Sequence, residues 1–244
     1  MRGVKGLILG VFCAGLTACA SAPPTPAMLA ANDPYEADNR DMMVFNGKVD
    51  RYFVAPTVGI YFVLVPDGGR AAVHRFLNNL TLPTTFVNDV LQGEAQRGRY
   101  TLERFVINST LGLAGFFDPA GSRFSIPAHS EDFGQTLATT FGAKEGPYLI
   151  LPFLGPSNPR DATGLAVDVA IDPTNFIPFK QHIWWAVGRE YSTVLDLRAQ
   201  TFSTVQGIQR SSVDYYAALR SLYRQIRAKG ILNGRPAGAD LPDF

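Results

Sequence analysis

The chain has 244 residues, of which 46% are hydrophobic and 18% charged, and its formal net charge is +1. This length is sufficient for one sizeable core. The content of 17 Phe, 9 Tyr and 2 Trp excludes a disordered chain. The near-neutral charge argues against a nucleic-acid-binding protein, which usually carries a basic excess.

Residues 1–18 have the pattern of a secretory signal peptide. Arg2 and Lys5 form a short basic region, and an apolar segment follows at 7–16. The apolar segment is too short for a transmembrane helix and is followed by small residues. We therefore expect residues 1–18 to be removed from the mature protein.

The signal ends in L-T-A-C at 16–19, which matches a bacterial lipobox. We expect cleavage before Cys19 and attachment of a diacylglyceryl and an acyl group to this residue, which together anchor a protein firmly to a membrane. The alternative is an ordinary signal that happens to contain a cysteine. Ala20, in place of an Asp, makes the outer membrane the default destination.

The mature chain divides into three parts. Residues 19–32 carry the predicted lipid and a Pro- and Ala-rich tether without packing capacity. Residues 33–230 form one predicted helical domain, and residues 231–244 form a flexible tail.

The domain begins with D-P-Y-E at 33–36, where Asp33 is the predicted helix cap. Pro56 is expected to end this first helix. The segment 54–65 is almost wholly apolar, and its periodicity alone does not distinguish a strand from a helix. Pro66 closes that segment.

Further helices are expected along the rest of the domain. Regular structure should be short between 108 and 160, which is rich in Gly and Pro. A capping box of Ser211 and Asp214 is predicted to start the last helix, and Gly230 to end it. The other predicted helices are 68–80, 84–92, 94–107 and 181–206.

Three uncharged stretches of the domain are 13 to 15 residues long, at 52–66, 105–117 and 146–159. A 13-residue helix covers about 20 Å, whereas the hydrocarbon core of a bilayer is about 30 Å thick. These stretches therefore belong either to a protein core or to one leaflet of a membrane, and composition alone favours the core.

A series of motifs resembles the VacJ/MlaA family of outer-membrane lipoproteins. The resemblance extends over about residues 33–229, with Ala138 as a local departure where Gly is usual. The motifs are D-P-Y-E-A-D-N-R (33–40), F-N-G-K-V-D (45–50), N-D-V-L-Q-G (88–93), E-D-F-G-Q-T-L (131–137), G-P-Y-L-I-L-P (146–152) and G-P-S-N-P-R-D-A-T-G (155–164).

The resemblance implies an all-α, single-domain ring embedded in the outer membrane, with a central amphipathic channel and access from the periplasmic side. It implies that residues 58–65 are helical or irregular rather than a strand. It further implies removal of mislocalised phospholipids from the outer leaflet and their transfer to a periplasmic lipid carrier. A trimeric porin is the third implied partner, alongside the phospholipid and the carrier.

On this interpretation no bond is made or broken, and no cofactor is needed besides the lipid on Cys19. The alternatives are a structural, porin-associated lipoprotein and a lipid hydrolase. Candidate channel or gate residues are Phe45, Asn46, Gly146, Pro147, Tyr148, Gly155, Arg160 and Asp161.

Two groups of charged residues have open interpretations. Arg160 and Asp161 form either an ion pair on a wet surface or part of a polar path for head groups. A row of arginines on the last helix is either a solvated face or a surface for lipid heads or the carrier. This row consists of Arg220, Arg224 and Arg227.

Evidence for an enzyme is weak. The sequence at 155–159 resembles G-x-S-x-G but lacks the final Gly, and Ser157 is better interpreted as a helix cap. His74, His129 and His182 show no metal-binding spacing and are expected at the surface or on helix faces. Glu131 and Asp132 are interpreted as charges at a helix N-terminus.

Overall fold

The computed structural model describes residues 25–176 and 182–233. The predicted signal peptide, Cys19 and the tail from 234 onward lie outside the described residues. Within them the domain is all-α, as predicted, apart from one small antiparallel sheet. The sheet pairs β1 (Leu149–Leu151) with β2 (Gly155–Ser157), and Ile150 lies opposite Pro156.

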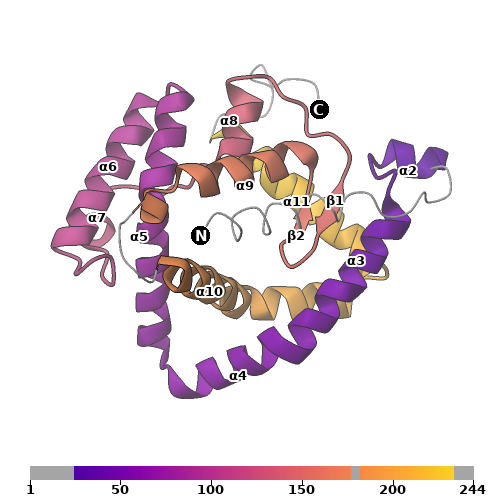
Figure 1. The fold of residues 1–244 in the computed structure, drawn as a ribbon, viewed down its shortest axis with the longest axis horizontal. Coiled ribbons are helices and arrows are strands. Elements are labelled where there is room, and N and C mark those ends of the chain that lie inside the picture. Colours follow the sequence, from indigo (N-terminus) through magenta and orange to yellow (C-terminus); the bar gives the residue numbers. More distant parts are fainter. Residues whose placement is uncertain (1–24, 177–181, 234–244) are drawn as a thin grey trace.

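The helices form a ring (Figure 1). Contacts run from α5 to α8, from α8 to α9 and α11, and from α11 through the β-hairpin to α3, which continues through η1 into α4, while α10 packs against α4, α5 and α11. The helical elements are α2 (Pro26–Ala30), α3 (Glu36–Val49), the π-helix η1 (Asp50–Val54), α4 (Ala55–Leu64), α5 (Asp67–Leu91), α6 (Ala95–Thr110), α7 (Pro119–Ser122), α8 (Phe133–Thr139), α9 (Pro159–Ile171), the 3₁₀-helix η2 (Pro173–Phe176), α10 (His182–Ser211) and α11 (Tyr215–Leu232).

The first long helix does not end at Pro56, so this prediction is wrong. The π-turn η1 joins α3 to α4 without a break, and the backbone N–H of Ala55 donates to the carbonyl of Asp50. Pro56 therefore lies in the first turn of α4, where a missing N–H is tolerated. The helical assignment of residues 58–65 is confirmed, and Val65 is the extended residue that ends α4.

Two predicted helices are one in the structure, since α5 continues through Pro83. An internal proline removes one backbone hydrogen bond and usually kinks or breaks a helix. Here the turns after Pro83 bury Thr85, Asn88 and Asp89, and α5 packs along α6. Tertiary packing thus holds the helix together across the proline.

The ends of the last helix also differ from the prediction. Asp214 caps α11 by accepting from the backbone N–H groups of Tyr216 and Ala217. Ser211 instead belongs to α10, where its hydroxyl donates to the carbonyl of Gly207. The helix passes Gly230 and ends with Asn233 in the left-handed conformation, so residues 231 and 232 are helical rather than tail.

The end of the predicted tether is ordered. Residues 26–30 form α2, and the side-chain amide of Asn32 donates to Glu145 and to the carbonyl of Gly146, 3.1 and 2.7 Å away. Asp33 makes no cap for α3, whose N-cap is Tyr35. The Asp33 carboxylate is fully buried and accepts hydrogen bonds from three side chains, those of Asn39, Tyr216 and Arg220.

The distribution of side chains is inverted relative to a water-soluble domain. Among the described residues, nine hydrophobic side chains are buried against 17 polar or charged ones. Large hydrophobic side chains lie exposed on α3, α4, α6 and α10, including Val63 and Trp184, with exposed fractions of 84% and 72%. Exposed apolar surface on this scale marks an interaction with a membrane or a partner. No helix in the described part of the chain has the length and apolarity to cross a bilayer.

Candidate functional site

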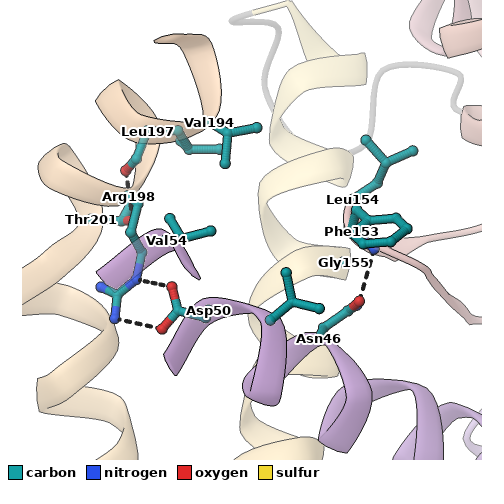
Figure 2. Close-up of a pocket in the computed structure, with 11 residues that line it drawn as sticks. Asn46, Asp50, Val54, Phe153, Leu154, Gly155, Val194, Leu197, Arg198 and Thr201 are labelled. Atoms are coloured by element: carbon teal, nitrogen blue, oxygen red, sulfur yellow. Dashed lines mark hydrogen bonds and ion pairs between the residues drawn. The ribbon is translucent and has the colours of Figure 1, made fainter. Parts of the chain in front are cut away.

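A cavity of about 230 Å³ lies where the α3–η1 helix, the tip of the β-hairpin and α10 meet (Figure 2). Three elements far apart in the sequence contribute its walls. They supply Asn46, Val49, Asp50 and Val54 from the first helix, Phe153, Leu154 and Gly155 from the hairpin, and Val194, Leu197, Arg198 and Thr201 from α10.

Asn46 holds the hairpin tip at this cavity. Its amide nitrogen donates to the carbonyl of Leu151 at 2.9 Å, and its oxygen accepts from the backbone N–H of Phe153 at 2.8 Å. Phe153 has a positive φ of 65°, which is costly for a residue with a side chain. The neighbouring Phe45 contacts the Phe153 ring edge-on, with 5.4 Å between ring centroids. These contacts balance the backbone strain at the tip.

An ion pair between two partly buried side chains forms the polar end of the cavity. The Arg198 guanidinium donates to both carboxylate oxygens of Asp50, at 2.7 and 3.1 Å. The hydrogen bond that Arg198 donates to Asp50 is the main cause that raises the pKa of Arg198. Because Val54 and Leu197 line the same space, the cavity combines apolar walls with fixed charge and is amphipathic.

The predicted channel residues do not all lie in this cavity. Asn46 and Gly155 line it, and Phe45 contacts its rim. Gly146 has a φ of 72° and approaches Pro159 closely, and Pro147 beside it is half-buried. Tyr148 is 2% exposed and packs edge-on against Tyr216, so it belongs to the small apolar core.

Arg160 and Asp161 are buried rather than at a wet surface. Arg160 is 5% exposed; its Nε donates to Asp161 at 2.9 Å, and its two terminal nitrogens have no hydrogen bond. Asp161 also accepts from Arg227 and from the hydroxyl of Tyr223. This carboxylate therefore links α9 to α11. A contact of Arg160 with lipid head groups stays a prediction.

The three arginines of α11 are all paired with carboxylates of the chain itself. Arg220 contacts Asp33 at 2.5 Å, and Arg224 contacts Glu145 at 2.7 Å. Arg227 bonds to Asp161 and also donates both terminal nitrogens to Asp132, the cap of α8. Arg220 and Arg227 have 17% exposed side chains, so their solvated-face interpretation is wrong. Binding of lipid heads or a carrier by this row stays a prediction.

The pKa values around Arg227 follow from this pairing. The Arg227 guanidinium lowers the pKa of Asp132 against the opposing effect of burial. Asp132 and Asp161 together raise the pKa of Arg227. The neighbouring Glu131 differs, since burial raises its pKa even though Arg97 pairs with it. The network thus holds charges inside the ring and keeps them compensated.

The histidines and Ser157 do not form a catalytic constellation in the described residues. His129 was expected at the surface or on a helix face, but it lies in the loop before α8, where its side chain is 12% exposed and its Nε2 contacts the buried Asp89 at 2.9 Å. His74 pairs with Asp196 of α10 at 2.7 Å, and the His182 side chain lies outside the described residues. Ser157 is part of β2, and Asn158 is the cap of α9. In the described part of the chain no His, Cys, Asp and Glu cluster could hold a metal.

Two functional features could not be identified from the sequence. The Asp50–Arg198 pair joins positions 148 residues apart, and the buried Asp89–His129 contact joins positions 40 apart. Neither pair belongs to a local motif.

A polar interior, an apolar exterior and helices arranged as a ring define a membrane-associated helical protein. Residues 31–230 match the model of the MlaA lipoprotein family. The chain belongs to this family, as the motifs predicted.

Relatives with known names support the assignment. The intermembrane phospholipid transport system lipoprotein MlaA of Escherichia coli (strain K12) is 35% identical, over 83% of this chain and 79% of its own. The protein of the same name from Haemophilus influenzae is 32% identical, over 86% and 83%. A solved structure described as the structural basis for maintenance of bacterial outer membrane lipid asymmetry has a TM-score of 0.70 and 31% identity, covering 82% of this chain and 98% of its own.

Proposed function

We propose that this protein is an outer-membrane lipoprotein that removes mislocalised phospholipids from the outer leaflet and passes them to a periplasmic lipid carrier. Its activity would maintain the lipid asymmetry of the outer membrane. The inverted distribution of side chains carries the proposal, because an apolar exterior suits lipid and a polar interior suits a head group. The names of the curated relatives agree with it.

The cavity of Figure 2 suits this task. Val54, Leu197 and the hairpin tip offer apolar contacts, while Asp50 and Arg198 offer charge. A phospholipid carries both kinds of surface, so one amphipathic cavity can accommodate parts of each. The Asn46 clamp on the hairpin would act as a gate to this space. Transport on this account makes and breaks no bond and needs no cofactor.

The partners follow from the position in the membrane. Lipid on Cys19 would anchor the chain, and the exposed apolar side chains of α4 and α6 would face acyl chains or a porin trimer. The cavity of Figure 2 would open towards the periplasm, where a soluble carrier would accept the phospholipid. A purely structural, porin-associated lipoprotein is the second candidate, and it would bind the porin without moving lipid.

Deletion of the gene in its host tests the proposal. Phospholipid in the outer leaflet, measured with a membrane-impermeant amine label, should rise in the deletion strain. The wild-type gene should reverse the rise, and Cys19→Ser should not. Unchanged labelling in the deletion strain would contradict the transport function and favour the structural one.

A further inference from the structure

A second cavity, of about 500 Å³, lies between α5, α6 and the loop that precedes α8. It shares no lining residue with the cavity of Figure 2. Its size falls within the range of small-molecule sites. Its lining includes His74, Arg75, Asn79, Arg104, Asp118 and His129.

Asn79, which lines this cavity, has a buried hydrogen-bond acceptor without a partner among the described residues. It is 4% exposed, and its amide nitrogen donates to the hydroxyl of Ser109 and the carbonyl of Ala114, at 2.9 and 3.3 Å. A carbonyl can only accept, so the orientation of the amide is fixed. Its Oδ1 atom has no hydrogen bond in the described part of the chain. A buried acceptor without a partner is costly, and a ligand with an N–H or O–H group would satisfy it.

Arg75 brings a charge that the described residues leave uncompensated. Its Nε donates to the carbonyl of Phe116 at 2.9 Å, and no ion pair to a carboxylate is formed within the described ranges. Arg104, in contrast, donates to both oxygens of Asp118 at 2.9 Å. The two histidines are bonded to buried carboxylates. In the described part of the chain Arg75 is therefore a lining arginine without an ion pair, and its guanidinium suits a phosphodiester.

Phe116 connects this polar cavity to an apolar one. Its ring stacks on Phe76 with 4.7 Å between centroids and lines a cavity of about 400 Å³ together with Trp184 and Trp185. Its carbonyl meets Arg75. The Arg75 guanidinium and the apolar cavity thus lie on either side of Phe116. This arrangement favours a lipid, which has a charged and an apolar part, over a free phosphate compound.

We propose that the polar cavity binds the head group of a phosphoglyceride whose terminal group is a hydrogen-bond donor, as in ethanolamine or glycerol. Arg75 binds the phosphate, and the Oδ1 atom of Asn79 accepts from the terminal ammonium or hydroxyl. Choline has no such donor. The proposal rests on the proposed function, and adds to it a selectivity among head groups.

The test uses the full-length lipoprotein in detergent, incubated with micelles holding equal amounts of phosphatidylethanolamine, phosphatidylglycerol and phosphatidylcholine. Bound lipid is identified by native mass spectrometry. We expect the wild type to bind the first two classes at least about fivefold over the third, as a satisfied buried acceptor implies. Soluble glycerophosphoethanolamine, added at the same concentration, should not displace them.

Variants assign the effect to the cavity. Asn79→Leu should abolish the discrimination against choline, and Arg75→Gln should lower binding of all three classes at least about fivefold. Arg123→Gln, which removes an exposed arginine after α7, is the matched control and should behave as wild type. Ser130→Trp blocks the cavity from its exposed rim and should reduce binding even if Asn79→Leu does not fold.

Equal binding of the three lipids by the wild type overturns the proposal, as does discrimination that survives in Asn79→Leu or binding that is unchanged in Ser130→Trp. Displacement by the soluble compound overturns the lipid assignment. If lipid binds without discrimination, the transport function stands and only the selectivity fails. Absence of bound lipid of any class contradicts both.

Discussion

Asp50 and Arg198 are 148 positions apart and are joined by two hydrogen bonds of 2.7 and 3.1 Å. Asp50 begins the π-turn between α3 and α4, and Arg198 lies near the middle of α10. π-turns inside α-helices occur frequently at functional sites. The pair fixes α10 against the junction of α3 and α4, and the cavity of Figure 2 lies beside it.

A double-mutant cycle of Asp50→Asn and Arg198→Gln should give a coupling energy of about 1 kcal/mol, since the pair is only partly screened by solvent. Denaturant unfolding in detergent provides the measurement. The exposed Arg99–Glu103 pair of α6 is the control and should couple by about 0.3 kcal/mol. Additive effects at Asp50 and Arg198 would mean that the pair does not hold α10.

Arg227→Gln should destabilise the fold by about 2 kcal/mol, because it removes the cation shared by the partly exposed carboxylate of Asp132 and the buried carboxylate of Asp161, which then keeps only Arg160. Arg224→Gln is the matched change on the same helix. Its side chain is 38% exposed and contacts one carboxylate, so the expected loss is below about 1 kcal/mol. Thermal or denaturant unfolding measures both. Equal losses of unfolding free energy in Arg227→Gln and Arg224→Gln would contradict the larger role assigned to Arg227.

Asn46→Ala should loosen the hairpin tip without unfolding the ring. The backbone N–H of Phe153 loses its acceptor, and its amide exchange should accelerate about fivefold, as expected for one lost hydrogen bond. Hydrogen exchange measured by mass spectrometry over residues 149–157 reports this. Asn175→Ala, which removes one side-chain bond to the carbonyl of Val169, should leave the hairpin unchanged. Unaltered exchange in Asn46→Ala would show that the Asn46 side chain does not hold the hairpin tip in place.

Asp214→Asn should weaken the fold only above acidic pH. Its pKa is lowered from 3.8 to about 2, mainly by the hydrogen bond from Arg40. The carboxylate therefore stabilises the folded state above about pH 4, and this contribution is lost as the pH falls through about 2. Because the side chain is largely exposed, we expect about 0.5 kcal/mol. Asn preserves the helix cap.

Unfolding midpoints of wild type and Asp214→Asn, measured from pH 8 to pH 2, provide the check. Their difference should be constant between pH 8 and 5 and should vanish near pH 2. If the difference between the two midpoints instead grows as the pH falls, the Asp214–Arg40 contact does not stabilise the folded state in the way proposed.

Much of the fold was predictable because local and global preferences agree. The helix after Glu94 and the short elements of 108–160 follow from patterning and from Gly and Pro. The helical state of 58–65 came from the family resemblance, since its β-branched residues leave the periodicity ambiguous. The predicted helix ends near Pro56 and Pro83 were wrong, because a proline ends a helix only where the lost hydrogen bond is not compensated. At Pro56 the π-helix η1 continues the chain into α4, and at Pro83 packing against α6 holds α5 together.

The site was less predictable, because its polar contacts join distant segments. Asn46 and Gly155 were candidates and line the cavity, whereas Arg198 was missed. The α11 arginines recur at helical spacing, which is typical of a solvated face. Only the tertiary structure brings Asp33, Glu145 and Asp132 to them.

Transfer of phospholipid from a membrane to a soluble acceptor tests the central claim most directly. Full-length protein is reconstituted with the proposed porin partner into vesicles holding a fluorescent phospholipid, and the proposed periplasmic carrier is added outside. The account predicts transfer to the carrier well above that of vesicles with porin alone, and slower transfer when Asp50→Asn disrupts the amphipathic cavity. Transfer no faster than from porin vesicles, with the protein folded and porin-bound, would contradict it.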